Sequence, residues 1–379
     1  METKLLNGNN KEAIAEASKI LQDGGLVAFP TETVYGLGAD ALNADAAAKI
    51  YAAKGRPSDN PLIVHIADTD AVEKLADLET MNRAHPDMVK KAHMLMEAFW
   101  PGPLTIIFPK LAIVPDGTTG GLPTVAIRMP SHPIAQELIR TSGVSIAAPS
   151  ANTSGRPSPT TAQHVWEDMD GRIEMILDGG AVGIGIESTI VDMTGTIPTI
   201  LRPGFITKTM LSEIVGDVTI DPAIIEPDPN LRPKAPGMKY THYAPHGTLS
   251  IVEAAADESA NRASLHSGVK VSYNATEAET LRVAEKIKAL VNEKEAQGYK
   301  VAILTTREHA SLYKNYSHVL IVGEGSKGQT ISARLYAALR ECDSEQMEYM
   351  YSEAFDQNEL GGAIMNRLLK AAGHRVITV

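Results

Sequence analysis

Residues 54–66 read KGRPSDNPLIVHI and hold the most informative group of polar side chains in the chain. Lys54, Arg56 and Asn60 lie in a proline-stiffened turn, and an apolar stretch then leads to His65. Lysine and arginine in such a turn can hold phosphate oxygens, as a point charge and as a planar fork respectively. A solvated basic turn after a helix end is the competing interpretation. The run alone does not decide between them.

The flanking sequence predicts a domain built on a mixed sheet. Asn43 is a good N-cap for a helix that ends at Gly55, and Leu62–Ile66 then has the composition of a buried strand. Other expected strands are Leu26–Phe29, Leu104–Phe108, Thr124–Arg128, Ser145–Ala147, Met175–Asp178, Thr189–Asp192 and Thr199–Arg202. Other expected helices are Lys11–Gln22, Pro86–Ala98, Pro133–Thr141, Thr161–Met169 and Lys208–Val215. Because some strands follow each other directly, a twisted mixed sheet flanked by helices fits better than a parallel one.

The last third of the chain predicts a second, smaller domain. Expected strands at Leu249–Val252, Val269–Ser272, Val301–Thr305, Val319–Val322 and Val376–Val379 alternate with helices, including a long one at Glu277–Gln297. This pattern is typical of a doubly wound, Rossmann-like α/β domain. We therefore expect a catalytic domain at 1–216, a linker at 217–247 and a C-terminal domain at 248–379.

Composition limits the class of protein. The 379 residues are 44% hydrophobic and 21% charged, as in a globular protein, and the single Cys342 excludes an intrachain disulfide. The first residues lack a signal-peptide pattern, and no apolar run is long enough to span a membrane, so we expect a cytoplasmic protein without membrane contact. Residues 1–230 hold 17 Lys and Arg against 29 Asp and Glu, which gives no electrostatic argument for RNA binding.

Two further loops and two strand ends carry candidate binding residues. The loop FPTETVYGLGADA at 29–41 and the loop APSANTSGRPSPT at 148–160 are rich in hydroxyls and glycines, which suit an anion or substrate pocket. Arg128 and Arg202 end apolar strands, where the ligands of α/β sheets usually bind. Ordinary turns and surface arginines are the competing interpretations of these features.

Several common catalytic motifs are missing from the sequence. It has no G-x-x-x-x-G-K-[ST] run, no G-x-S-x-G nucleophile elbow and no spacing typical of a protein metal site. GEGSKG at 323–328 matches G-x-G-x-x-G, but it lies late in its domain, so a tight turn is the favoured interpretation.

Seven motifs, taken together and in this order, resemble the YrdC-like family of L-threonylcarbamoyladenylate synthases. They are FPTETVYGLGADA, KGRPSDNPLIVHI, FWPGPLT, TVAIRMPSHP, APSANTSGRPSPT, ESTIVD and ILRPG. The linker APGMKYTHYAP at 235–245 and the C-terminal half are similar to the longer, two-domain form of that enzyme. Ala235 departs from the family pattern, which usually has serine there, so this position offers no linker hydroxyl.

The resemblance implies a nucleotidyltransferase that converts L-threonine, bicarbonate and ATP, with Mg²⁺ accompanying ATP, into threonylcarbamoyl-AMP and pyrophosphate. It implies transfer of the product to a separate complex that modifies tRNA, and a weak contact with tRNA. No metal site formed by the protein is expected.

The resemblance also implies roles for individual residues. Lys54 and Arg56 would be catalytic, and ATP would bind Arg56, Asn60, Thr124, Ser150, Ser158, Arg202 and Tyr243. Threonine would bind Thr33, His65, Arg128, Ala148 and Ser188, with its carboxylate on Arg128. The residues expected to fold over the site as a lid are Lys239, Tyr240, His242 and Tyr243.

Two other functions remain open at this point. One is a module that binds double-stranded RNA or tRNA, against which the acidic charge of the first 230 residues argues. The other is a carbamoyltransferase that uses carbamoyl-adenylate; such relatives carry acylphosphatase and zinc-finger modules that this sequence lacks.

Overall fold

The computed structural model describes residues 2–224, 234–236, 243–255, 275–355 and 359–379. The chain divides into two units. Unit 1 holds Met1–Ser154 and Ser158–Tyr240, and unit 2 holds Gly155–Pro157 and Thr241–Val379. The expected domain boundaries at 216 and 247 stay predictions, because much of the linker lies outside the described residues. In the described part of the chain, no helix is both long and apolar enough to cross a membrane.

Among the described residues of unit 1, eleven strands form one mixed sheet. In spatial order they are β1 (Lys4–Asn7), β8 (Met175–Asp178), β2 (Val27–Pro30), β3 (Tyr35–Asp40), β7 (Ile146–Ala147), β4 (Ile63–His65), β6 (Thr124–Arg128), β5 (Leu104–Pro109), β9 (Thr189–Asp192), β10 (Thr199–Arg202) and β11 (Thr219–Ile220). Parallel pairs such as β4–β6 and β5–β9 alternate with antiparallel pairs such as β5–β6 and β9–β10. The predicted mixed sheet is confirmed.

Helices bury both faces of this sheet. They are α1 (Lys11–Gln22), α2 (Ala44–Lys54), α3 (Leu78–Ala84), α4 (Pro86–Phe99), α5 (Asp116–Thr119), α6 (Pro133–Ser142), α7 (Ala162–Met169) and α8 (Lys208–Val215), with 3₁₀ turns at Thr69–Lys74 and Pro222–Ile224. Successive side chains of a strand point to opposite faces. On β2, Val27 and Phe29 therefore pack in a core with α1 and α6, while Ala28 belongs to the core that contains Ile50 of α2.

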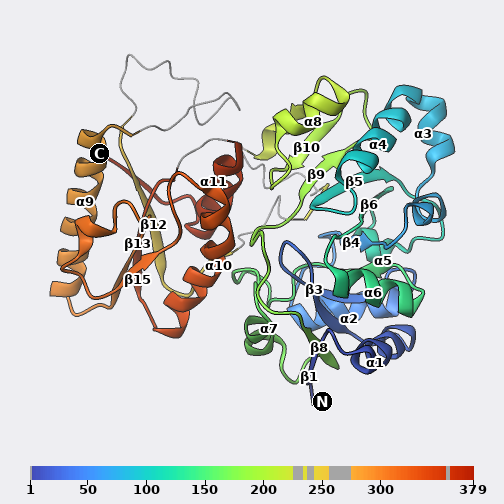
Figure 1. Ribbon diagram of the computed structural model, residues 1–379, viewed down its shortest axis with the longest axis horizontal. Coiled ribbons are helices and arrows are strands. Elements are labelled where there is room, and N and C mark those ends of the chain that lie inside the picture. Colours follow the sequence, from blue (N-terminus) through green and yellow to red (C-terminus); the bar gives the residue numbers. More distant parts are fainter. Residues whose placement is uncertain (1, 225–233, 237–242, 256–274, 356–358) are drawn as a thin grey trace. The chain divides into compact units, whose positions relative to one another are not determined.

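Unit 2 contains a five-stranded parallel sheet among its described residues. Its strands, in spatial order, are β14 (Val319–Ile321), β13 (Val301–Thr305), β15 (Tyr349–Glu353), β12 (Thr248–Glu253) and β16 (Val376–Thr378). Figure 1 shows α9 (Glu277–Ala296) on one side of it and α10 (Gly328–Ser344) and α11 (Glu359–Ala371) on the other; a 3₁₀ turn spans Ala310–Tyr313. The predicted doubly wound domain is confirmed, and the GEGSKG run forms the turn from β14 to α10.

The cap residues set the ends of the helix that precedes the KGRPSDNP turn. The side chain of Asn43 accepts hydrogen bonds from the backbone N–H groups of Asp45 and Ala46, and α2 begins there. Gly55 ends it with φ of 63°, a left-handed conformation that glycine adopts without strain. As the last residue of α2, Lys54 lies at the point where the chain turns into the polar loop.

Candidate active site

Four strands of unit 1 bring the two predicted arginines into one row across the sheet. On β6, Arg128 lies opposite His65 of β4 and opposite Thr105 of β5. Thr105 lies opposite Ile190 of β9, and Ile190 lies opposite Arg202 of β10. Because β6 and β10 run in the same direction, both arginines lie at the same edge of the sheet. Three strand spacings, about 14 Å, separate them.

Arg128 is buried and held by an acceptor on each of its three nitrogens. Nη2 donates to Glu32 Oε1 at 2.7 Å, Nη1 donates to Thr33 Oγ1 at 3.0 Å, and Nε donates to the carbonyl of Gly102 at 3.4 Å. The second carboxylate oxygen of Glu32 accepts the N–H of Ser131 at 3.2 Å. A guanidinium has five N–H groups, so these contacts leave one on Nη1 and one on Nη2. That remaining pair can receive a carboxylate.

Arg202 is also buried, and it is oriented by Ser188. Its Nε donates to the backbone carbonyl of Ser188 at 3.0 Å, and its Nη2 lies 3.1 Å from the hydroxyl of the same residue. The Ser188 hydroxyl is 2.8 Å from the hydroxyl of Thr105. Thr105 thus connects the surroundings of Arg202 with the strand that pairs with β6.

Lys54 joins the end of α2 to the loop that follows β7. Its ammonium group is buried and donates to the carbonyls of Ser150, at 2.5 Å, and Asn152. The hydroxyl of Ser150 in turn donates to Asn152 Oδ1 at 2.5 Å. The predicted catalytic lysine and the predicted ATP-binding Ser150 therefore lie together.

Arg56 and Asn60 belong to one turn. The Nε of Arg56 donates to the carbonyl of Asn60 at 3.3 Å, and its Nη2 donates to that of Pro61 at 3.1 Å. The hydroxyl of Tyr51 is shared between the same Asn60 carbonyl, at 3.3 Å, and the carbonyl of Gly117, at 3.0 Å. The side-chain oxygen of Asn60 is buried, and no hydrogen-bond partner for it is found among the described residues. A buried acceptor in this state suits contact with a ligand that carries a donor.

Three other predicted residues lie in the same unit. Ser158 is buried, and its hydroxyl donates to Glu187 Oε1 at 2.6 Å. Glu187 is the residue before Ser188 in the sequence. Ala148 is buried, and its N–H donates to the carbonyl of Ile63 at 2.8 Å. Thr124 is half-buried at the start of β6, four residues and about 13 Å along the strand from Arg128.

His65 lies in an apolar environment that keeps its imidazole neutral. Its Nδ1 is 3.0 Å from the carbonyl of Ile63, and its ring meets the edge of Phe29 with centroids 6.1 Å apart. Burial and, after it, the positive charge of Arg128 lower the pKa of His65 to about 3. At neutral pH His65 can therefore share a hydrogen bond with a substrate but adds no charge to the site.

This lowered pKa predicts a pH dependence of stability. In the unfolded chain the imidazole takes up a proton below its ordinary pKa of 6.5, whereas in the folded chain it does so only near pH 3. The free energy of unfolding should therefore fall as the pH drops below 6.5, with His65 contributing at most about 1.4 kcal/mol per pH unit. Urea unfolding of the wild type and His65→Asn between pH 7.5 and 5 measures this slope. The variant should show a shallower slope, while exposed His93→Asn should not; equal slopes for all three would contradict the prediction.

Tyr243, which is predicted to bind ATP, belongs to unit 2. Its ring stacks on that of Tyr336, with centroids 5.1 Å apart, and the guanidinium of Arg367 lies 6.0 Å from its centroid. The other expected lid residues, Lys239, Tyr240 and His242, lie outside the described residues. The role of the linker as a lid stays a prediction.

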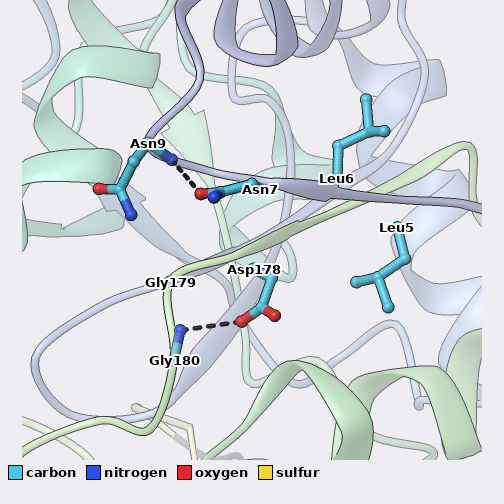
Figure 2. Close-up of a pocket in the computed structure, with 7 residues that line it drawn as sticks. All are labelled: Leu5, Leu6, Asn7, Asn9, Asp178, Gly179 and Gly180. Atoms are coloured by element: carbon cyan, nitrogen blue, oxygen red, sulfur yellow. Dashed lines mark hydrogen bonds between the residues drawn. The ribbon is translucent and has the colours of Figure 1, made fainter.

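One cavity at the surface of unit 1 lies apart from the predicted residues. It has a volume of about 440 Å³ and is formed where β1 and β8 end (Figure 2). Its lining residues are Leu5, Leu6, Asn7, Asn9, Asp178, Gly179 and Gly180. None of the residues predicted to bind threonine or ATP lines this cavity.

Two carboxylates of the site have roles that the sequence did not reveal. Glu32 pairs with Arg128, and Glu187 accepts the hydroxyl of Ser158. Each carboxylate is next in sequence to a predicted residue, Thr33 and Ser188 respectively. The sequence offered one signal for them. A carboxylate within a motif of mostly uncharged residues is expected to pair with a buried cation such as Arg128.

The fold and this site define an α/β enzyme that acts on anionic substrates. Family models support this class and make it specific. Residues 19–204 match the Sua5/YciO/YrdC family, described as "Telomere recombination", and residues 206–373 match the "Threonylcarbamoyl-AMP synthase, C-terminal domain".

Whole-chain relatives agree with both models. The chain is 46% identical to the threonylcarbamoyl-AMP synthase of Bacillus subtilis, over 97% of this chain and 95% of the relative. It is 41% identical to the synthase of Pyrococcus abyssi, over 98% of each. A crystal structure of P. abyssi Sua5 complexed with L-threonine matches all of both chains, with a TM-score of 0.84 and 40% identity. The chain belongs to the threonylcarbamoyl-AMP synthase family, in its two-domain Sua5 form.

Proposed function

We propose that this chain joins L-threonine, CO₂ from bicarbonate and ATP to form L-threonylcarbamoyl-AMP and pyrophosphate. The observation that carries the proposal is the row of His65, Arg128, Thr105 and Arg202 at one edge of the unit 1 sheet. Membership in a family of synthases named for this product supports it. The threonine complex of the P. abyssi relative supports the choice of amino acid.

Threonine binds with its carboxylate on Arg128 in this proposal. One N–H group remains on Nη1 and one on Nη2, and both can donate to the oxygens of a carboxylate. Thr33 and Ser188 offer hydroxyls, and neutral His65 offers an uncharged polar edge. Ala148 is the remaining residue proposed to contact threonine, and its side chain is a single methyl group.

ATP occupies the side of the site formed by the two polar loops. The residues proposed to contact it are Lys54, Arg56, Asn60, Thr124, Ser150, Ser158, Arg202 and Tyr243. Lys54 and Arg56 neutralise charge on the phosphates, which is the main requirement of phosphoryl chemistry. Mg²⁺ enters with the nucleotide as its counter-ion.

The reaction needs orientation more than a covalent intermediate. The neutral amine of threonine attacks CO₂, a C–N bond forms, and the nitrogen loses a proton to give a carbamate. A carbamate oxygen then attacks the α-phosphate, and the bond from that phosphorus to the pyrophosphate oxygen breaks in line. The product is a mixed anhydride that water hydrolyses, so the linker with Tyr240 and Tyr243 is proposed to cover it.

The product is proposed to pass to a separate transferase complex that modifies tRNA, and the expected compartment is the cytoplasm. Two results would replace this proposal with another function, either binding of double-stranded RNA or carbamoyl transfer from carbamoyl-adenylate. Salt-sensitive RNA binding without nucleotide turnover would favour the first. Turnover of carbamoyl phosphate that does not need threonine would favour the second.

Pyrophosphate release from ATP tests the proposal directly. The reaction is measured with the full chain, and threonine and bicarbonate are omitted in turn. Release that requires both supports the proposal. Release that is equally fast without threonine contradicts it.

Replacing Arg56 tests the ATP assignment. Arg56→Ala should lower pyrophosphate release by about 100-fold, the usual effect of losing a charge that stabilises a phosphoryl transition state. The fold should persist, because the hydroxyl of Tyr51 still contacts the carbonyls of Asn60 and Gly117 and so holds the turn. The Tm and the rate of pyrophosphate release are measured together, and exposed Arg83→Ala is the control. Unchanged activity would show that the central assignment is wrong.

A further inference from the structure

Three residues of the motif APSANTSGRPSPT belong to unit 2. Gly155–Pro157 groups with the C-terminal unit, although the residues on either side belong to unit 1. Before the tripeptide, the N–H of Ser154 donates to the carbonyl of Lys54 at 2.8 Å. After it, Ser158 donates to Glu187. The loop is therefore held in unit 1 at both ends and in unit 2 at its middle.

Inside unit 2, every residue of the tripeptide has a polar partner. The Nε and Nη2 of buried Arg340 donate to the carbonyl of Pro157 at 3.1 and 2.6 Å. Arg156 forms an ion pair of 3.5 Å with Asp343, and the carbonyl of Gly155 accepts the N–H of Ala244 at 2.9 Å. Arg340 and Asp343 are three residues apart on α10, so they share one face of that helix.

The contact with Arg340 fixes more than one atom. The carbonyl of Pro157 and the nitrogen of Ser158 belong to one planar peptide group, which also includes the Cα of Ser158. The proline ring limits φ of Pro157, so little freedom remains ahead of Ser158. Two hydrogen bonds from a charged group to the Pro157 oxygen therefore orient the backbone from which the Ser158 side chain extends.

We propose that Arg340 is a positioning residue for the ATP site, through which the C-terminal unit holds Ser158 in the orientation that binds nucleotide. Asp343 assists by holding Arg156. The inference rests on the proposed contact between Ser158 and ATP, and it gives the C-terminal unit a direct part in the reaction. The carboxylate of threonine is assigned to Arg128, so we expect the affinity for threonine to depend little on Arg340.

Steady-state kinetics of Arg340→Gln in the full chain test the inference. The KM for ATP should rise about tenfold, as expected when a charge-assisted contact that orders a binding loop is lost. The KM for threonine should change by less than about twofold, since its carboxylate is assigned to Arg128 and not to this loop. Arg340→Lys should recover part of the ATP affinity because it keeps one charged donor.

Matched variants separate positioning from folding. Arg334 lies on the same helix, is partly exposed and pairs with Glu341. Arg334→Gln should therefore leave both KM values unchanged. Should Arg340→Gln fail to fold, Asp343→Asn provides the milder test, with an expected rise in the KM for ATP of about threefold. An equal rise in both KM values would indicate a structural role and overturn the inference.

Ser158→Ala distinguishes failure of the inference from failure of the proposed function. It should raise the KM for ATP, and combining it with Arg340→Gln should add little, because both changes act on one contact. If Ser158→Ala raises the KM for ATP and Arg340→Gln does not, the inference is wrong and the assignment of Ser158 stands. If Ser158→Ala has no effect, the assignment of Ser158 to ATP is wrong, and the inference falls with it.

Discussion

Arg128→Met is expected to abolish threonine-dependent pyrophosphate release and to lower the free energy of unfolding at the same time. Activity is lost because the remaining N–H pair of Arg128 is the proposed seat of the threonine carboxylate. Stability is lost because the carboxylate of Glu32, whose side chain is only 14% exposed, would lose its cationic partner. Breaking a buried pair in this way costs about 3–5 kcal/mol. Urea unfolding and pyrophosphate release measure the two effects separately.

A double variant separates them further. Glu32→Gln combined with Arg128→Met removes the stranded charge, so it should recover most of the stability without recovering activity. Arg128→Lys keeps the positive charge but loses the planar fork of donors. It should raise the KM for threonine strongly and lower Tm only slightly. Full threonine-dependent turnover in Arg128→Met would rule out Arg128 as the carboxylate site.

Lys54→Met is expected to lower kcat/KM by about 100- to 1000-fold, since it removes a cation assigned to the phosphates. The structure adds a second effect. The carbonyls of Ser150 and Asn152, which now accept from the ammonium group, would lose that donor. The loop that carries Ser150 should therefore loosen, at a cost of about 1–3 kcal/mol for a buried polar group left unsatisfied.

Lys49→Met is the matched control for Lys54. Lys49 lies on the same helix and also donates to a backbone carbonyl, that of Gly24 at 2.7 Å. It is not one of the predicted site residues. Its replacement should change Tm slightly and leave pyrophosphate release intact. If Lys49→Met and Lys54→Met reduced activity equally, Lys54 would act only through the fold.

The sequence predicted elements well where local signals were strong. Asn43 and Gly55 cap α2 as expected, and the strand that ends at Arg128 has the predicted bounds. It missed β3, because YGLGAD has two glycines and reads as a loop; pairing with β2 and β7 makes it a buried strand. It also missed β1 and β15. The strand expected at Val269–Ser272 lies outside the described residues.

Site prediction was limited in a different way. Sequence motifs proposed Arg128 and Arg202 as separate strand ends, but could not show that register places them in one row with Thr105. They indicated cations for phosphates, but not that Lys54 already donates to carbonyls or that Glu32 occupies part of the Arg128 fork. Such contacts join residues about 100 positions apart, and no local pattern encodes them.

The sequence by itself determined the family, the reaction it implies and the two α/β folds, since ordered motifs, caps and alternating apolar runs are local properties of the chain. KGRPSDNP was identified from its composition, but its geometry was not. Tertiary structure decided that its lysine faces the Ser150–Asn152 loop and that its arginine binds its own turn. It also decided that the carbonyl of Pro157 accepts hydrogen bonds from Arg340. Register and long-range hydrogen bonds form only when distant segments pack, so only the folded chain reveals them.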